Sequence, residues 1–138
     1  MKKIMIFSLI LFLSICLSAC SEQASEKLTR VDVQVADDQE IYVEEKIIQD
    51  EETLNTIKNV FQKIKWEPNT IADMARKEDV FVTLFYFIEE NMPERLYEYR
   101  IWFNGDGTAT IISNNENEGY GFLDEAKALE KILINKNK

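Results

Sequence analysis

Two neighbouring runs of sequence decide the fold of this chain: Val80-Phe-Val-Thr-Leu-Phe-Tyr-Phe-Ile88 and Arg95-Leu-Tyr-Glu-Tyr-Arg-Ile-Trp-Phe103. Both are rich in β-branched and aromatic residues, which favour strands. Asn91-Met92-Pro93-Glu94 lies between them and is typical of a turn. Asn104-Gly105-Asp106-Gly107 follows directly, and Asn-Gly and Asp-Gly pairs are strong hairpin signals. The sequence therefore predicts three consecutive antiparallel strands, the last over 108–113.

The segments on the N-terminal side predict two further strands and a helix. Val31, Val33 and Val35 alternate with polar residues as in a half-buried strand, and a second strand is expected over 41–48. Asp50 is a plausible helix N-cap. Apolar residues then recur at helical spacing, and the helix is expected to end at Trp66-Glu67-Pro68, because a residue before proline leaves the α region. The stripe consists of Leu54, Ile57, Val60, Phe61 and Ile64.

The C-terminal side predicts a short strand over 120–123 and a last helix with Ala126, Leu129, Ile132 and Leu133 on its inner face. The resulting order is ββ-α-βββ-α. A meander with helices on one face is an α+β two-layer sandwich with a mainly antiparallel sheet.

The two faces of the sheet can be assigned from an expected register. If Phe87 lies opposite Tyr97, an aromatic, uncharged face is formed beneath the helices, by Phe81, Thr83, Phe85 and Phe87 with Tyr97, Tyr99, Ile101 and Phe103. The opposite face then carries Tyr86, Glu98, Arg100 and Trp102, beside Leu84, Ile111 and Ser113. A register shift of one residue would reverse the assignment.

Tyr86, Glu98, Arg100 and Trp102 are the candidate partner-binding residues. Tyr, Trp and Arg carry much of the binding energy at protein interfaces, so an open sheet face of this kind predicts a recognition patch. The alternative is a purely structural one, in which Glu98 and Arg100 pair in solvent and Trp102 packs under a loop.

The N-terminus indicates export. Lys2 and Lys3 precede an apolar run from Ile4 to Leu17, which is shorter than the ~20 residues of a membrane-spanning helix. A basic start, a short apolar region and small residues at the cleavage point are typical of a secretory signal. The run ends in Leu17-Ser18-Ala19-Cys20, which resembles the lipobox of bacterial lipoproteins.

The lipoprotein resemblance implies cleavage before Cys20, attachment of diacylglycerol to its sulfur, and anchoring to the outward face of the cell membrane. Residues 1–19 are then the signal peptide, 20–28 the lipidated cysteine and a flexible tether, 29–135 a single α+β domain, and 136–138 a tail. A plain secretory signal with an incidental cysteine is the alternative.

The composition excludes several kinds of chemistry. The chain has no histidine, and its only cysteines are Cys16 and Cys20, so the domain has no Ser-His-Asp or Cys-His mechanism, no disulfide and no Cys or His zinc site. Removal of Lys2 and Lys3 leaves 14 basic against 25 acidic residues, a net charge of −11. This charge disfavours nucleic acid and suits a cationic partner, although an acidic solubilising surface is the simpler explanation of it.

Two further patterns resemble functional sites. Asn104-Gly105-Asp106-Gly107 has calcium-loop residue types, but Trp102 stands where an EF-hand loop needs a ligand, so a hairpin is predicted instead. Carboxylates cluster at Glu44-Glu45, Asp50-Glu51-Glu52 and Glu89-Glu90. A glycosidase pair needs two carboxyl groups about 5–9.5 Å apart across a cleft, and the sequence leaves that possibility open.

Short motifs in the mature chain are similar to the YhfM-like group, small uncharacterised lipoproteins of Bacillus-type bacteria. They are Trp66-Glu67-Pro68, Met92-Pro93-Glu94-Arg95, Tyr99-Arg100-Ile101-Trp102-Phe103 and Tyr120-Gly121. The resemblance implies that the protein lies on the outer side of the membrane of a Gram-positive bacterium. It implies no activity and no functional residues.

The sequence thus predicts a membrane-anchored extracytoplasmic domain that binds a cationic envelope protein or peptide, with no cofactor, metal or catalytic residue. The alternative is a carboxylate-dependent hydrolase acting on cell-wall glycans.

Replacement of Cys20 tests the anchoring. The Cys20→Ala variant is expected to lose signal processing and membrane retention, because two acyl chains stabilise anchoring by about 0.8 kcal/mol per buried CH₂ and the variant cannot carry them. Membrane fractionation with metabolic palmitate labelling measures both effects, with Cys16→Ala as the control that keeps the lipobox. Unchanged retention of Cys20→Ala would contradict the prediction.

Overall fold

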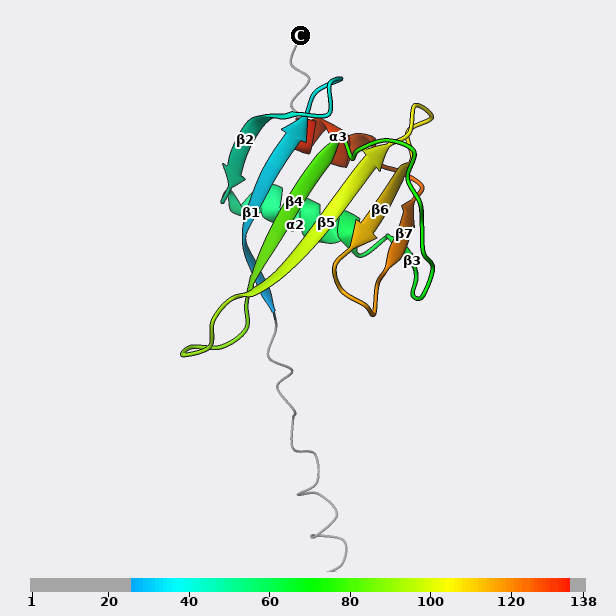
Figure 1. Cartoon of the computed structure of the whole chain (residues 1–138). Helices are drawn as coiled ribbons and strands as arrows, with labels where there is room; N and C mark the ends of the chain where they lie inside the picture. The colour runs from blue at the N-terminus through cyan, green and yellow to red at the C-terminus, as the bar shows by residue number, and fades with distance from the viewer. Residues whose placement is uncertain (1–25, 135–138) are drawn as a thin grey trace, which may run out of the picture.

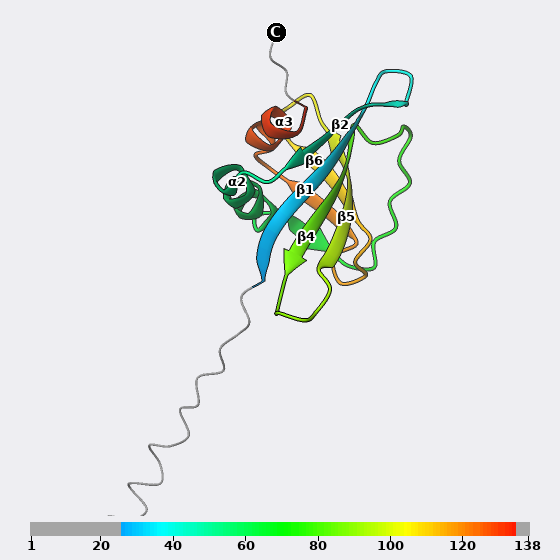
Figure 2. The same cartoon turned by 90° about the vertical axis from the view of Figure 1, so that its left-hand side faces the viewer.

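The fold is described by a computed structural model over residues 26–134. The predicted signal peptide, the predicted lipidation site Cys20 and the predicted tail over 136–138 lie outside these described residues. Within them, a seven-stranded antiparallel sheet carries two helices on one face (Figure 1 and Figure 2). The expected α+β two-layer architecture with a mainly antiparallel sheet is confirmed.

The sheet has the strand order β2-β1-β4-β5-β6-β7-β3, so β2 and β3 form its two edges. Every neighbouring pair is antiparallel. The helices are α2 (Glu51–Phe61) and α3 (Lys127–Ile134). The strands are β1 (Lys27–Ala36), β2 (Tyr42–Ile48), β3 (Lys65–Glu67), β4 (Val80–Phe87), β5 (Arg95–Phe103), β6 (Ala109–Ser113) and β7 (Tyr120–Leu123).

Helix α2 begins as predicted and ends earlier than predicted. The Asp50 carboxylate accepts a hydrogen bond from the Thr53 backbone N–H at 2.9 Å, so the N-cap is confirmed. The predicted end at Trp66 is wrong, because the helix stops at Phe61 and Lys65–Glu67 forms strand β3 against β7. The backbone of Trp66 therefore satisfies its hydrogen bonds in the sheet.

Strand β1 begins two residues before the expected start of the domain. Leu28 was predicted to belong to the tether, but it pairs with Tyr86 of β4 and its side chain joins the core with 5% exposure. Burial of an apolar side chain next to a central strand stabilises the fold, so pairing with β4 is favoured over an exposed tether. The domain therefore includes Lys27 and Leu28, and the earlier part of the predicted tether lies outside the described residues.

The pairing of β4 with β5 differs from the predicted register. Tyr97 lies opposite Leu84, not opposite Phe87, a difference of three residues. The connection between the strands sets this register, with Asn91 at a positive φ of 72° and the Met92 N–H bonded to the Glu89 carbonyl. Because side chains alternate between faces, an odd shift places every β4 side chain on the face opposite to the predicted one.

The core therefore lies against aliphatic side chains of β4. Val80, Val82 and Leu84 are fully buried under the helices, where they face the valines of β1. The predicted core residues Phe81, Thr83, Phe85 and Phe87 lie instead on the outer face, and the Arg30 guanidinium stands 3.9 Å from the Phe85 ring centre. For β5 the predicted inner face is correct, since Tyr99 and Ile101 are buried.

Strand β3 packs closely on β7, and this contact generates a stability prediction. Trp66 pairs with Gly121, and a Cβ placed on Gly121 would lie 2.6 Å from both Ile64 Cγ2 and the Trp66 ring. The Gly121→Ala variant is expected to lower the free energy of unfolding by about 1–3 kcal/mol, measured by urea denaturation, because it overpacks this contact. Gly105→Ala is the matched control, since nothing lies within 4 Å of its Cβ position. Equal effects of the two changes would contradict the packing argument.

Candidate functional site

The four predicted partner-binding residues do not share one face. Glu98 and Arg100 lie exposed on the outer face of β5. Tyr86 lies on the helix side, where its ring meets the Tyr97 ring edge-on with centroids 5.7 Å apart. The β4–β5 register is the reason, because it turns Tyr86, together with the other even-numbered residues of β4, toward the helices.

Trp102 is on the outer face but does not reach solvent. Its side chain is 2% exposed, and its indole N–H donates to the Arg76 carbonyl at 3.0 Å. The Asp79 carboxylate holds this covering segment in place by pairing with Arg76 at 2.6 Å and accepting the Phe103 N–H at 2.7 Å. The alternative weighed for Trp102, packing beneath a loop, is therefore the arrangement found.

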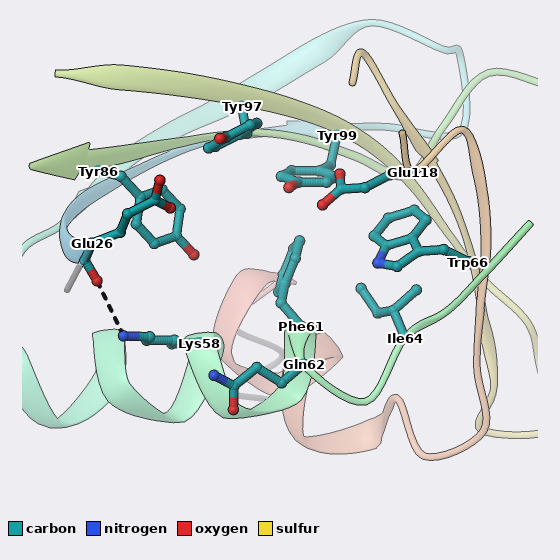
Figure 3. Close-up of a pocket in the computed structure, with 10 residues that line it drawn as sticks. All are labelled: Glu26, Lys58, Phe61, Gln62, Ile64, Trp66, Tyr86, Tyr97, Tyr99 and Glu118. Carbon is teal, nitrogen blue, oxygen red and sulfur yellow. Dashed lines mark hydrogen bonds between the residues drawn. The ribbon is translucent and has the colours of Figure 1, made fainter. Parts of the chain in front are cut away.

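A cavity of about 470 Å³ lies instead between the helix side of the sheet and α2 (Figure 3). The side chains of three tyrosines from β4 and β5 form one wall of the cavity, and α2 forms the opposite wall. Trp66 and Ile64 close one end. The lining residues are Glu26, Lys58, Phe61, Gln62, Ile64, Trp66, Tyr86, Tyr97, Tyr99 and Glu118.

Aromatic rings make up most of this lining and contact one another. The Tyr99 ring meets the Phe61 ring edge-on at 4.9 Å and lies 6.0 Å from the Trp66 ring. With the Tyr86–Tyr97 pair, these contacts hold five rings around one space. Such pairs prefer defined geometries, so the cavity has walls that are largely preformed.

Two carboxylates and one cation, the Lys58 ammonium, border the same space. The Glu26 carboxylate pairs with Arg95 at 3.0 Å, and the Glu26 carbonyl accepts a hydrogen bond from Lys58 Nζ at 3.2 Å. Glu118 accepts a hydrogen bond from Ser113 Oγ at 2.6 Å. These bonds fix the direction of both acidic side chains relative to the rings.

Burial and two nearby carboxylates both act on the tyrosine hydroxyls. Burial, together with the smaller effects of the Glu26 and Glu118 charges, raises the pKa of Tyr86 to about 12. Burial and Glu118 likewise raise the pKa of Tyr99 well above its ordinary value. Aromatic faces attract a cation, and Glu118 adds to that attraction because no cation pairs with it among the described contacts, so the Glu118 end of the cavity is chemically suited to an ammonium or guanidinium group.

The predicted hairpin and the acidic clusters have structural explanations. The Asn104–Gly107 segment forms the predicted hairpin, in which Asn104 N–H bonds to the Thr108 carbonyl at 2.9 Å and Asp106 accepts the Thr108 N–H at 3.0 Å. Among residues 26–134, no group of three or more acidic, histidine or cysteine side chains is placed to hold a metal ion. No helix in this part of the chain is long and apolar enough to cross a membrane.

Comparison with protein-family models, with curated proteins and with solved structures finds no match to this chain. The cavity is therefore the feature of this chain that bears most directly on its function.

Trp102 is expected to be structural, and a pair of substitutions tests this. Trp102→Ala should lower the free energy of unfolding by about 3–5 kcal/mol, because it empties a buried site and leaves the Arg76 carbonyl without its donor. Arg100→Ala, on the same strand and face but exposed, should change it by no more than about 0.5 kcal/mol. Thermal or urea unfolding measures both. If Trp102→Ala left the free energy of unfolding unchanged, Trp102 would not be structural, and a role in partner recognition would again be open.

Proposed function

We propose that this protein is a non-catalytic binding domain, held on the outer face of the cell membrane by diacylglyceryl Cys20, and that its cavity receives a cationic group of an envelope protein or peptide. The lipobox supports the location. The single observation that supports the binding role is a cavity in which five aromatic rings and two glutamates face one space.

The binding free energy expected for a single cation is small, so a partner that presents its cation on a larger surface is favoured. One cation over an aromatic face contributes about 0.5–2 kcal/mol, depending on how far it is desolvated. That amount corresponds to weak binding for an isolated ammonium ion. A peptide or protein that adds contacts at the rim, where Gln62 is exposed and Lys58 is half-buried, would bind more tightly.

The acidic surface would assist the encounter. The whole chain carries a net charge of −9, and opposite charge on a partner raises the association rate by steering. Salt screens such steering, so binding is expected to weaken as ionic strength rises.

A carboxylate-dependent hydrolase of cell-wall glycans is the rival function. It is favoured by one observation, the presence of both Glu26 and Glu118 in the same cavity. The binding proposal is preferred because the Glu26 carboxylate is engaged by Arg95 and Glu118 by Ser113. Release of soluble fragments from purified cell walls would support the hydrolase instead.

Titration of the full-length lipidated protein in detergent tests the binding role. The probe is acetyl-trilysine amide, and the readout is tryptophan fluorescence, since Trp66 lines the cavity. The lysine peptide should bind and acetyl-triglutamate amide should not. Glu118→Gln, which keeps the shape of the side chain, should weaken binding by about fivefold, the equivalent of roughly 1 kcal/mol for a partly screened charge.

The matched control is Glu125→Gln, an exposed carboxylate next to the start of α3 and outside the cavity lining, which should leave the affinity unchanged. If both substitutions weakened the affinity for the lysine peptide equally, net charge alone would explain the binding. Equal affinity for the lysine and glutamate peptides would overturn the cationic ligand.

A further inference from the structure

The cavity beside α2 has two ends of opposite charge. Figure 3 shows Lys58 of α2 directed toward Glu26 at one end and Glu118 at the other end, with the Phe61 ring between them. Attraction of a cation by the rings and Glu118 involves only one of these ends. A ligand group that brought positive charge to both ends would meet a like charge at Lys58.

The Lys58 ammonium retains hydrogen-bonding capacity for a ligand. Its Nζ donates to the Glu26 carbonyl at 3.2 Å, and among residues 26–134 no carboxylate forms an ion pair with it. An ammonium group has several N–H donors, and a single neutral acceptor leaves the others available. The Glu26 carboxylate does not neutralise this end, because Arg95 pairs with it at 3.0 Å. The Lys58 end is therefore net positive and suits an anionic group.

The Glu118 end has the opposite character. Its carboxylate accepts a hydrogen bond from the neutral Ser113 Oγ at 2.6 Å, and no cation pairs with it in the described part of the chain. The Tyr99 and Trp66 rings, whose centroids are 6.0 Å apart, line the same end. A carboxylate beside aromatic rings suits an ammonium or guanidinium group.

We propose that the cavity binds the C-terminal residue of a basic peptide or protein, a lysine or arginine whose side-chain cation meets Glu118 and whose α-carboxylate meets Lys58. This inference rests on the proposed function and specifies the ligand of the same site. A cavity of about 470 Å³ lies in the size range of pockets that enclose small ligands, so it has room for one such residue. A basic residue inside a chain lacks the carboxylate and leaves Lys58 without a partner, so the terminal residue is preferred.

The acidic character of the protein makes the proposal easy to distinguish from a general charge effect. The whole chain has a net charge of −9, which repels an additional carboxylate on a ligand. If overall charge decided the affinity, a basic peptide with a free C-terminus would bind more weakly than its amide. The cavity with two charged ends predicts the reverse order.

Titration of the full-length lipidated protein in uncharged detergent measures this order. The probes are acetyl-trilysine with a free C-terminal carboxylate and acetyl-trilysine amide, and the readout is tryptophan fluorescence, since Trp66 lines the cavity. The acid should bind about fivefold more tightly than the amide, because it gains a partly screened ion pair with Lys58. Free lysine, which carries the same two charges, should bind more weakly than the peptide acid.

The matched variants are Lys58→Met and Lys63→Met, which change the net charge equally. Lys63 is exposed just after α2 and does not line the cavity. Lys58→Met should abolish the preference for the acid and should bind the amide more tightly, because a like charge leaves the cavity. Lys63→Met should keep the preference. Tighter binding of the amide by Lys58→Met would also show that this variant retains its cavity.

The possible failures are distinguishable. Equal affinity of the unsubstituted protein for the acid and the amide would overturn the inference and leave the proposed function standing. Binding of neither peptide would overturn both. Loss of the preference in both variants would attribute it to overall charge and overturn the inference. Free lysine that bound as tightly as the peptide acid would overturn the peptide terminus in favour of a free amino acid.

Discussion

The register between β4 and β5 is the constraint on which the rest of the structure depends. With Leu84 opposite Tyr97, the aliphatic side of β4 faces the helices, and Val80, Val82 and Leu84 are completely buried. Side chains alternate along a strand, so any odd shift would bury the phenylalanines and expose these residues. The same register directs Tyr86 and Tyr97 to one side of the sheet, beyond the closely packed centre of the core. The cavity thus results from the pairing that stabilises the core.

The cavity and the outer face illustrate two uses of aromatic residues. Around the cavity, rings from β4, β5, α2 and β3 contact one another and leave space between them, with carboxylates directed by hydrogen bonds. On the outer face, Trp102 fills its site beneath the segment that contains Arg76, and its indole N–H is satisfied. A satisfied, covered tryptophan stabilises a fold, whereas aromatic rings beside open space can contact a ligand.

Much of the fold could be predicted from sequence, because hydrophobic periodicity and turn residues are local signals. The alternation at Val31, Val33 and Val35 and the Asp50 cap gave correct elements. Strand β3 was missed because three residues carry almost no periodic signal and their pairing with β7 is a long-range contact. The register was wrong because it depends on the seven-residue connection over 88–94, whose conformation includes Asn91 at a positive φ. Of the residues that line the cavity, only Tyr86 could be named from sequence as a candidate binding residue, whereas Phe61, Tyr97 and Tyr99 were predicted to be core residues. Glu26 and Glu118 lie in separate segments that meet only in three dimensions.

The central claim is that the cavity beside α2 is where the protein meets its partner. Site-specific photocrosslinking in intact cells tests this most directly, with p-benzoylphenylalanine placed at exposed Gln62 on the cavity rim and, as a control, at exposed Arg100 on the outer face. The account predicts a discrete adduct with a basic envelope protein or peptide from position 62, lost when Glu118→Gln is added, and no such adduct from position 100. The same adduct from both positions, or one from position 62 that Glu118→Gln leaves intact, would contradict it.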